Sequence, residues 1–178
     1  IKCLYPEYGP RVGYVATVVY ALKSPYTAGL RDRWVLWEHL DESPKPVILC
    51  AKQDFPPELK DRVGLFGGNM AAQFEAMGVV GVVSDGPTRD LDEIREETNL
   101  QMLVTGLTPG HGDFVVRDVA VPVTIGGMSV MPGDMLHMDV HGACKFPARH
   151  ADKAFFRSSD FSLERWKARE ADASNPYR

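Results

Sequence analysis

The chain has 178 residues, of which 44% are hydrophobic and 25% are charged, and its formal net charge at pH 7 is −4. This profile predicts one globular domain with a sizeable core, since the chain is too short for two domains of ordinary size. The negative net charge and the scattered basic residues argue against a nucleic-acid partner, and the apolar runs are too short and interrupted to span a membrane.

The cysteines bear on the compartment in which the protein works. Cys3, Cys50 and Cys144 are odd in number, widely spaced and without a CxxC pair. This pattern argues against structural disulfides and a zinc site, and it favours a reducing cytoplasm. No signal peptide is visible, but the chain begins at Ile1 rather than at a methionine, so a leader or an earlier domain would lie outside it.

In chain order, the first part of the sequence alternates between strand and helix patterns. Apolar runs predict strands at residues 11–22, 45–52, 79–86 and 101–106. Helical patterns predict helices at residues 32–40, 70–78 and 88–97, with Gly78 capping the second. Strands and helices that alternate at this spacing are typical of parallel βαβ units.

After Gly110 the pattern changes to short β segments separated by Gly and Pro turns. These segments cover residues 113–127, 128–134 and 135–147, and they predict antiparallel or mixed β structure. Two charged helices are expected at residues 148–156 and 163–171. The fold class is therefore α/β, with a parallel βαβ part and a β-rich C-terminal half in one domain over residues 1–157. Residues 158–178 are expected to form a charged helix or tail that packs on a neighbouring subunit.

Two junctions between a strand and the following helix are candidates for a binding site, because ligands of open α/β sheets bind beyond the carboxyl ends of strands. In LFGGNMAA, paired glycines allow close approach of a ligand, and the next helix offers free N–H groups at Asn69 and Met70. In SDGPTRD, Arg89 stands at the positive end of a helix, where a cation is unfavourable unless an anion docks there. If both junctions face one pocket, Arg89 would hold a small oxo acid and Asp90 a hard divalent cation.

Each of these features also has an ordinary structural interpretation. The glycine pair is compatible with a simple turn, and it belongs to neither a P-loop nor a GxGxxG fingerprint. Asp90, Asp92 and Glu93 are typical capping residues, and capping is the interpretation that we favour for the last two. The alternative for the arginine is an ion pair with Asp85 or Glu93.

The segment HMDVH offers a second candidate metal site. On a flat strand His137, Asp139 and His141 would point to one side, and two imidazoles with a carboxylate can bind a transition metal. However, PGD precedes the segment and Gly142 follows it, so the alternative is a bend in which these polar residues line a turn.

Two blocks of sequence resemble one known family. GGNMAAQFEAMGVVGVVSDGPTRDLDEI and VPVTIGGMSVMPGDMLHMDVHGACKFP are similar to the regulator of ribonuclease E activity A (RraA-like) family, which includes the 4-hydroxy-4-methyl-2-oxoglutarate/4-carboxy-4-hydroxy-2-oxoadipate aldolases. The similarity covers about residues 11–154. It implies a swivelling β/β/α-type fold that assembles as homotrimers or homohexamers, with active sites at subunit interfaces.

The same resemblance implies roles for individual residues. Arg89 matches the arginine that binds the pyruvate moiety, and Asp90 matches the aspartate that holds Mg²⁺ or Mn²⁺ largely through waters. Gly68, Asn69 and Met70 match the loop whose backbone amides bind the substrate carboxylate.

The chain departs from the aldolase pattern at two places. About twenty residues before the Arg-Asp pair, the aldolases carry an acidic residue that orders a water for proton transfer, and the matching residue here is Gly68. The family's ribonuclease regulators also have glycine at this position. Relatives have a helical segment before the first strand, which this chain lacks.

Two hypotheses about function follow. The first is a divalent-metal-dependent lyase that cleaves a carbon–carbon bond of a 2-oxo acid through a metal-stabilised pyruvate enolate. Its reaction would be retro-aldol cleavage of a 4-hydroxy-2-oxo diacid, oxaloacetate decarboxylation, or both. A water on the metal, or an acid of a neighbouring subunit such as Glu164, would take the hydroxyl proton. The second is a non-catalytic regulatory protein on the same scaffold, which Gly68 favours.

Overall fold

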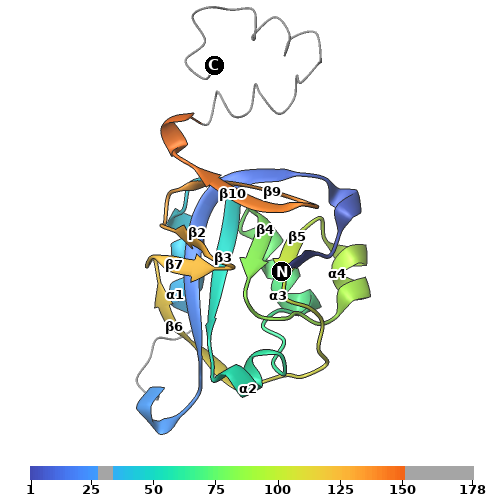
Figure 1. Ribbon diagram of the computed structural model, residues 1–178, viewed down its shortest axis with the longest axis vertical. Coiled ribbons are helices and arrows are strands. Elements are labelled where there is room, and N and C mark those ends of the chain that lie inside the picture. Colours follow the sequence, from blue (N-terminus) through green and yellow to red (C-terminus); the bar gives the residue numbers. More distant parts are fainter. Residues whose placement is uncertain (28–33, 151–178) are drawn as a thin grey trace, which may run out of the picture. The chain divides into compact units, whose positions relative to one another are not determined.

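A computed structural model of the chain describes residues 1–27 and 34–150. The chain divides into two units, Ile1–Phe146 and Pro147–Arg178. In the second unit the described residues form one short 3-10 helix, η3 (Ala148–His150). The rest of the two helices expected at the end of the chain, and the expected domain boundary at 157, lie outside the described residues. Figure 1 shows the elements of the first unit.

Four parallel strands form the centre of the sheet, as predicted from the apolar runs. They are β2 (Arg11–Leu22), β3 (Val47–Asp54), β4 (Val79–Ser84) and β5 (Gln101–Val104). Their order across the sheet is β5-β4-β3-β2, which is typical of βαβ units. Beside β5 lies the antiparallel strand β1 (Lys2–Cys3), which was not predicted because two residues carry no periodic pattern.

The β-rich half expected after Gly110 is confirmed. It contains β6 (Phe114–Val119), β7 (Val123–Ile125), β8 (Met128–Val130), β9 (Met135–Asp139) and β10 (Gly142–Phe146). Because β2 is 12 residues long, one edge of it pairs antiparallel with β9 near its start and with β6 near its end. β10 extends the sheet beyond β9, while β7 and β8 form a separate hairpin.

The helices α1 (Trp34–Glu42), α3 (Gly68–Ala76) and α4 (Leu91–Glu97) pack on one face of the sheet, and the β7–β8 hairpin packs on the other (Figure 1). The short helix α2 (Pro57–Lys60) has no buried residue, and η1 (Pro6–Tyr8) and η2 (Pro25–Thr27) are 3-10 helices. On β3, Leu49 joins the core on the helix side, whereas Ile48 and Cys50 join the core on the hairpin side. Burial of both faces explains why β3 is almost continuously apolar.

Two helices begin at residues other than those predicted. α3 starts at Gly68 rather than Met70, so the second glycine of the pair is its first residue. α4 starts at Leu91 rather than Thr88. Thr88 instead forms parallel β-bridges with Phe66 and Leu107, and its buried hydroxyl donates a hydrogen bond to the Phe66 carbonyl at 2.9 Å. These long-range contacts compete successfully with the local tendency to start the helix.

The bridge holds the two strand-to-helix junctions side by side. The N–H of Leu65 donates to the Pro87 carbonyl at 2.9 Å, and the N–H of Arg89 donates to the Phe66 carbonyl at 3.0 Å. The backbones of the two junctions are therefore fixed to each other, so side chains that follow them start from neighbouring positions.

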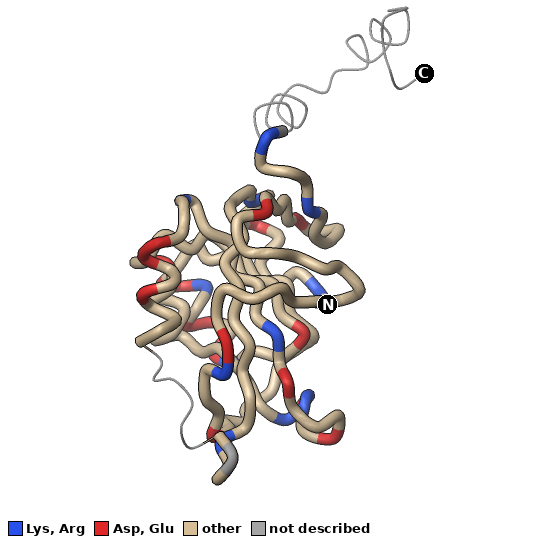
Figure 2. Tube along the Cα trace, turned by 90° about the vertical axis from the view of Figure 1, so that its left-hand side faces the viewer, with Lys and Arg blue, Asp and Glu red and all other residues tan. Residues whose placement is uncertain are grey.

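Three further features of the chain concern membrane-spanning helices, charged residues and cysteines. Within residues 1–27 and 34–150, no helix is both long and apolar enough to cross a membrane. Figure 2 shows Lys and Arg residues scattered along the trace among Asp and Glu residues. All three cysteines are free thiols, and burial raises the pKa of Cys50 to about 12.

We expect Thr88→Val to lower the free energy of unfolding by about 1 kcal/mol, because the buried hydrogen bond to the Phe66 carbonyl is lost while the shape is kept. For a domain of this size, that is a fall in Tm of about 2–4 °C, measurable by calorimetry. Thr124→Val is the control, since the Thr124 hydroxyl pairs with Ser129 on the exposed hairpin. Equal shifts for both variants would show that the Thr88 bridge adds nothing to stability.

Candidate active site

The N-terminus of α3 is capped by a side chain from the next junction. The N-cap residue Gly67 is in extended conformation, with φ −140° and ψ 179°, and makes no side-chain cap. The N–H of Gly68 donates instead to Oδ2 of Asp90 at 3.2 Å. The N–H groups of Asn69 and Met70 belong to the same first turn, where the helix itself provides no acceptor. The glycine pair is thus the start of a helix that faces Asp90, rather than a simple turn.

Both glycines are needed for close packing. A Cβ atom on Gly67 would overlap Oδ2 of Asp90 and lie 2.9 Å from Nε of Arg89. A Cβ atom on Gly68 would overlap the carboxyl group of Glu93. Since Gly67 has a φ that any residue adopts, the requirement for glycine there comes from the approach of these side chains and not from backbone conformation.

Asp90 occupies a strained backbone conformation. Its φ of 58° and ψ of 44° lie in the left-handed region, which is unfavourable for residues with a Cβ atom. As the N-cap residue of α4, it makes no side-chain hydrogen bond to its own helix, so the capping interpretation of its carboxylate is wrong. The carboxylate is directed across to α3 and remains 38% exposed. Strain of this kind is often found at functional sites.

Arg89 is held beside Asp90 by the backbone of the neighbouring junction. Its Nη1 donates to the Gly64 carbonyl at 2.7 Å, and its Nε lies 3.6 Å from Oδ2 of Asp90. The ion pair considered between Arg89 and Asp85 is not formed, because Asp85 contacts Lys52 at 2.5 Å and Lys60 at 3.7 Å. Among the described residues, the carboxylate partner of Arg89 is Asp90 rather than Asp85 or Glu93.

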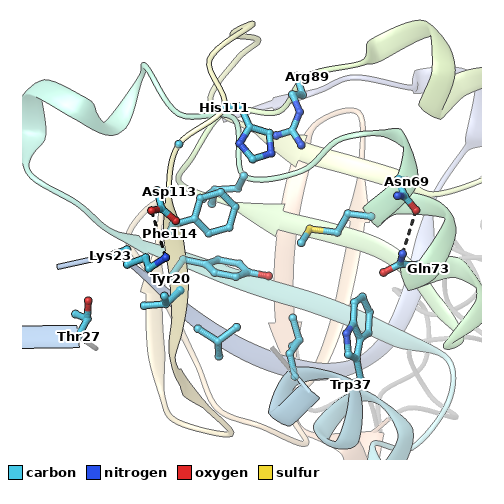
Figure 3. Close-up of a pocket in the computed structure, with 16 residues that line it drawn as sticks. Tyr20, Lys23, Thr27, Trp37, Asn69, Gln73, Arg89, His111, Asp113 and Phe114 are labelled. Carbon is cyan, nitrogen blue, oxygen red and sulfur yellow. Dashed lines mark hydrogen bonds and ion pairs between the residues drawn. The ribbon is translucent and has the colours of Figure 1, made fainter. Parts of the chain in front are cut away.

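A cavity of about 580 Å³ adjoins this pair of helix starts (Figure 3). Arg89, Asn69 and Met70 line it, so the structure brings three of the predicted site residues to one cavity. Gly68 and Asp90 are not lining residues, and Asp90 adjoins the cavity through its contact with Arg89. Its wall combines apolar and aromatic side chains, such as Leu36, Trp37 and Phe114, with several polar and charged ones. A concave site that brings polar groups together on an apolar wall is suited to a small molecule.

Several polar residues of this cavity were not predicted, among them His111 and Tyr20. His111 lies at the same end of the cavity as Arg89 in Figure 3 and comes from the loop before β6. Tyr20 is buried in the wall, and within the described part of the chain its hydroxyl has no hydrogen-bond partner. Neither residue stands in a recognisable sequence motif. The pairing of β2 with β6 brings the two residues to the same cavity, and this pairing is not visible in the sequence.

The HMDVH segment bends, as the second interpretation of it expected. β9 ends at Asp139, and the N–H of His141 in the following turn donates to Oδ1 of Asp139 at 2.8 Å. This hydrogen bond lowers the pKa of the Asp139 carboxyl below its usual value. Residues 1–27 and 34–150 contain no group of three or more His, Cys, Asp or Glu placed to hold a metal ion, so the flat-strand triad is not formed.

Comparison of the sequence with known proteins gives one family match. The sequence pattern of the RraA-like family, described as Aldolase/RraA, matches residues 1–144. A curated relative, 4-hydroxy-4-methyl-2-oxoglutarate aldolase of Thermus thermophilus, is 35% identical over 87 residues, which is 48% of this chain and 52% of the relative. The chain therefore spans about half the length of the curated relatives that it matches.

Two solved structures with a similar fold carry RraA names. The RNA-processing inhibitor RraA from Thermus thermophilus superimposes with a TM-score of 0.58 at 26% identity, covering 79% of each chain. RraAS2 of Streptomyces coelicolor, described as an unusual member of the RNase ES inhibitor RraA protein family, gives 0.66 at 26% identity, covering 92% of this chain and 77% of that one. The likeness confirms the expected fold class.

The strain at Asp90 can be tested by substitution. We expect Asp90→Gly to unfold with a free energy at least about 1 kcal/mol higher than Asp90→Ala, because only glycine adopts the left-handed conformation without cost. Urea denaturation of both variants measures the difference. At Glu96, inside α4, the order should reverse, with Ala better than Gly by about 1 kcal/mol. Equal stabilities for the two variants at position 90 would contradict a strained Asp90.

Proposed function

We propose that this chain, which belongs to the RraA-like family, is a divalent-metal-dependent lyase that releases pyruvate from 2-oxo acids by breaking a carbon–carbon bond. The reaction is retro-aldol cleavage of a 4-hydroxy-2-oxo diacid, oxaloacetate decarboxylation, or both. The observation that carries the proposal is the pair Arg89 and Asp90, held together at the start of α3 beside a cavity. The relative named 4-hydroxy-4-methyl-2-oxoglutarate aldolase supports the same reaction class.

The reaction needs positive charge and hydrogen-bond donors at two places. The substrate carboxylate needs donors, and the N–H groups of Asn69 and Met70 at the positive end of α3 suit it. Cleavage leaves negative charge on the 2-oxo oxygen, and the Arg89 guanidinium beside the cavity suits that charge. Because Arg89 is already fixed through the Gly64 carbonyl, it needs little reorganisation when the charge develops.

The residues present fit a hard divalent cation held by few protein ligands. Asp90 offers a partly exposed carboxylate, and the part of the chain that the structure describes has no cluster that would form an all-protein cage. Mg²⁺ and Mn²⁺ suit such a site, since they bind through one or two carboxylates, waters and substrate oxygens. When bound, the ion supplies positive charge that offsets the charge on the 2-oxo oxygen.

We extend the proposal to the substrate class, the assembly and the compartment of the enzyme. The substrate is a small 2-oxo acid, and the protein works as a homotrimer or homohexamer in the cytoplasm without nucleic-acid or membrane partners. The likeness to RraA structures supports the assembly only through the shared fold. Equilibrium sedimentation of the purified protein measures the number of subunits directly.

A second candidate function is a non-catalytic regulator on the same scaffold. The observation that favours it is the likeness to the RNA-processing inhibitor RraA, together with glycine at position 68. A regulator acts through its outer surface and has no need of a strained aspartate, a fixed arginine and a cavity at one place. For that reason the lyase is the function that we favour.

Asp90→Asn tests the metal site, because it removes one negative charge and keeps the side-chain shape. We expect Mg²⁺- or Mn²⁺-dependent pyruvate release from oxaloacetate or a 4-hydroxy-2-oxo diacid to fall nearly to background, with a small change in Tm. A coupled lactate dehydrogenase assay and calorimetric titration with Mn²⁺ measure the two losses. Wild-type protein that shows no metal-stimulated turnover of any such substrate would exclude the lyase and leave the regulator.

Arg89→Lys tests geometry at constant charge. A guanidinium can hold a carboxylate or an enolate with two parallel hydrogen bonds, whereas an ammonium acts as a point charge. We expect binding of pyruvate or oxalate to weaken by about 2 kcal/mol or more, roughly 30-fold, with the assembly intact. Titration calorimetry gives the affinity and size-exclusion chromatography the assembly. Unchanged affinity in Arg89→Lys would mean that the ligand does not contact the guanidinium.

A further inference from the structure

Retro-aldol cleavage requires a group that takes the proton of the 4-hydroxyl, and this requirement rests on the proposed function. We propose that Glu93 is the proton-transfer residue of this site, with its carboxylate in the space that glycine at position 68 leaves open. Glu164, the candidate named from the sequence, lies outside the described residues. Glu93 lies in the first turn of α4, where the sequence indicated that it would stabilise the start of the helix.

The position of the Glu93 carboxylate is defined by its contact with α3. A Cβ atom on Gly68 would overlap both Cδ and Oε1 of Glu93, so the carboxyl group lies directly against the first residue of α3. Glycine at position 68 leaves room for this approach, and a larger residue there would displace the Glu93 carboxyl group.

Glu93 also lies beside the proposed reacting groups. Arg89 and Asp90 lie where a Cβ atom on Gly67 would be, and Glu93 lies where a Cβ atom on Gly68 would be. Glu93 does not itself line the cavity that Arg89, Asn69 and Met70 line. The proposal therefore requires that a substrate held by the α3 amides and Arg89 through its 2-oxo acid end extends across Gly68, where its 4-hydroxyl would meet Glu93.

The acidic neighbours of Glu93 are engaged elsewhere. Asp92 pairs with Arg95 at 3.0 Å on the surface of α4, and Asp90 accepts the Gly68 N–H at 3.2 Å. In the part of the chain that the structure describes, Glu93 forms no hydrogen bond or ion pair that would hold its oxygens. Its carboxylate is exposed and available to a substrate.

Glu93 both accepts and returns the single proton that the retro-aldol step transfers. Glu93 accepts the proton of the 4-hydroxyl while the C3–C4 bond breaks and its electron pair passes to the pyruvate enolate, and C4 becomes a carbonyl carbon. The protonated carboxyl group then returns the proton to C3, which completes pyruvate and restores the carboxylate. No oxidant, reductant or further reactant is needed.

The test compares two reactions of the metal-loaded protein. Oxaloacetate decarboxylation has no hydroxyl proton to remove, and water can protonate the enolate that it leaves. For Glu93→Gln, we therefore expect turnover of a 4-hydroxy-2-oxo diacid to fall about 100-fold or more. The fall in oxaloacetate turnover should be at least about tenfold smaller than that. Glu96→Gln, one turn further along the same exposed helix, is the matched control and should leave both rates unchanged.

A second experiment moves the carboxylate from Glu93 on α4 to position 68 at the start of α3. Gly68→Asp alone should lower retro-aldol turnover, because the new side chain overlaps Glu93. Combined with Glu93→Ala, which empties that space, it should recover at least about tenfold over Glu93→Ala alone. Calorimetric titration of Glu93→Gln with Mn²⁺ and oxalate should match wild type, which separates proton transfer from assembly of the site.

The outcomes separate this inference from the proposed function. Equal losses of both reactions in Glu93→Gln, or no loss of retro-aldol turnover, would overturn the role of Glu93 while leaving the lyase in place. Weaker binding of Mn²⁺ and oxalate in Glu93→Gln would likewise overturn it, because the residue would then hold the site together. Wild-type protein inactive on both substrates removes the lyase, and with it any proton-transfer role.

Discussion

The hydrogen bond from the Gly68 N–H to the Asp90 carboxylate ties the start of α3 to the start of α4, and the rest of the site depends on it. It forms because a β-bridge between Phe66 and Thr88 already holds the two junctions together. It also places a negative charge at the positive end of α3 and so offsets the nearby Arg89 cation. Arginine next to a helix start is then tolerable, because an aspartate directed from the same junction compensates it.

Close approach is the second constraint, and it explains the glycine pair. Three charged side chains from one junction occupy the volume that side chains at positions 67 and 68 would fill. Glycine at position 68 is therefore compatible with an active site, because the missing side chain leaves room for Glu93. In a sequence comparison, Gly68 favours the regulator. In the structure, the same glycine lies against a carboxylate that α4 supplies, that of Glu93.

The sheet contributes a rigid support for the helix starts, and it also forms part of the cavity wall. Parallel strands buried on both faces fix the ends from which α3 and α4 start. The long strand β2 pairs with β6 as well as with β3, and this pairing carries His111 and Phe114 to the wall of the cavity. Loop residues near a rigid sheet edge are a common source of binding groups.

The sequence alone determined the four parallel strands, the α/β class and the choice of Arg89 and Asp90, because apolar periodicity and charge at helix starts are local properties. Tertiary contacts decided the rest. The Thr88 bridge to Phe66 moved the start of α4 to Leu91, and a turn hydrogen bond bent the HMDVH segment. Glu93 looked like a capping residue until its contact with Gly68 was known, since that contact joins residues 25 positions apart in the chain. Patterns along a chain report which way a side chain points from its own element, but only packing decides what it meets there.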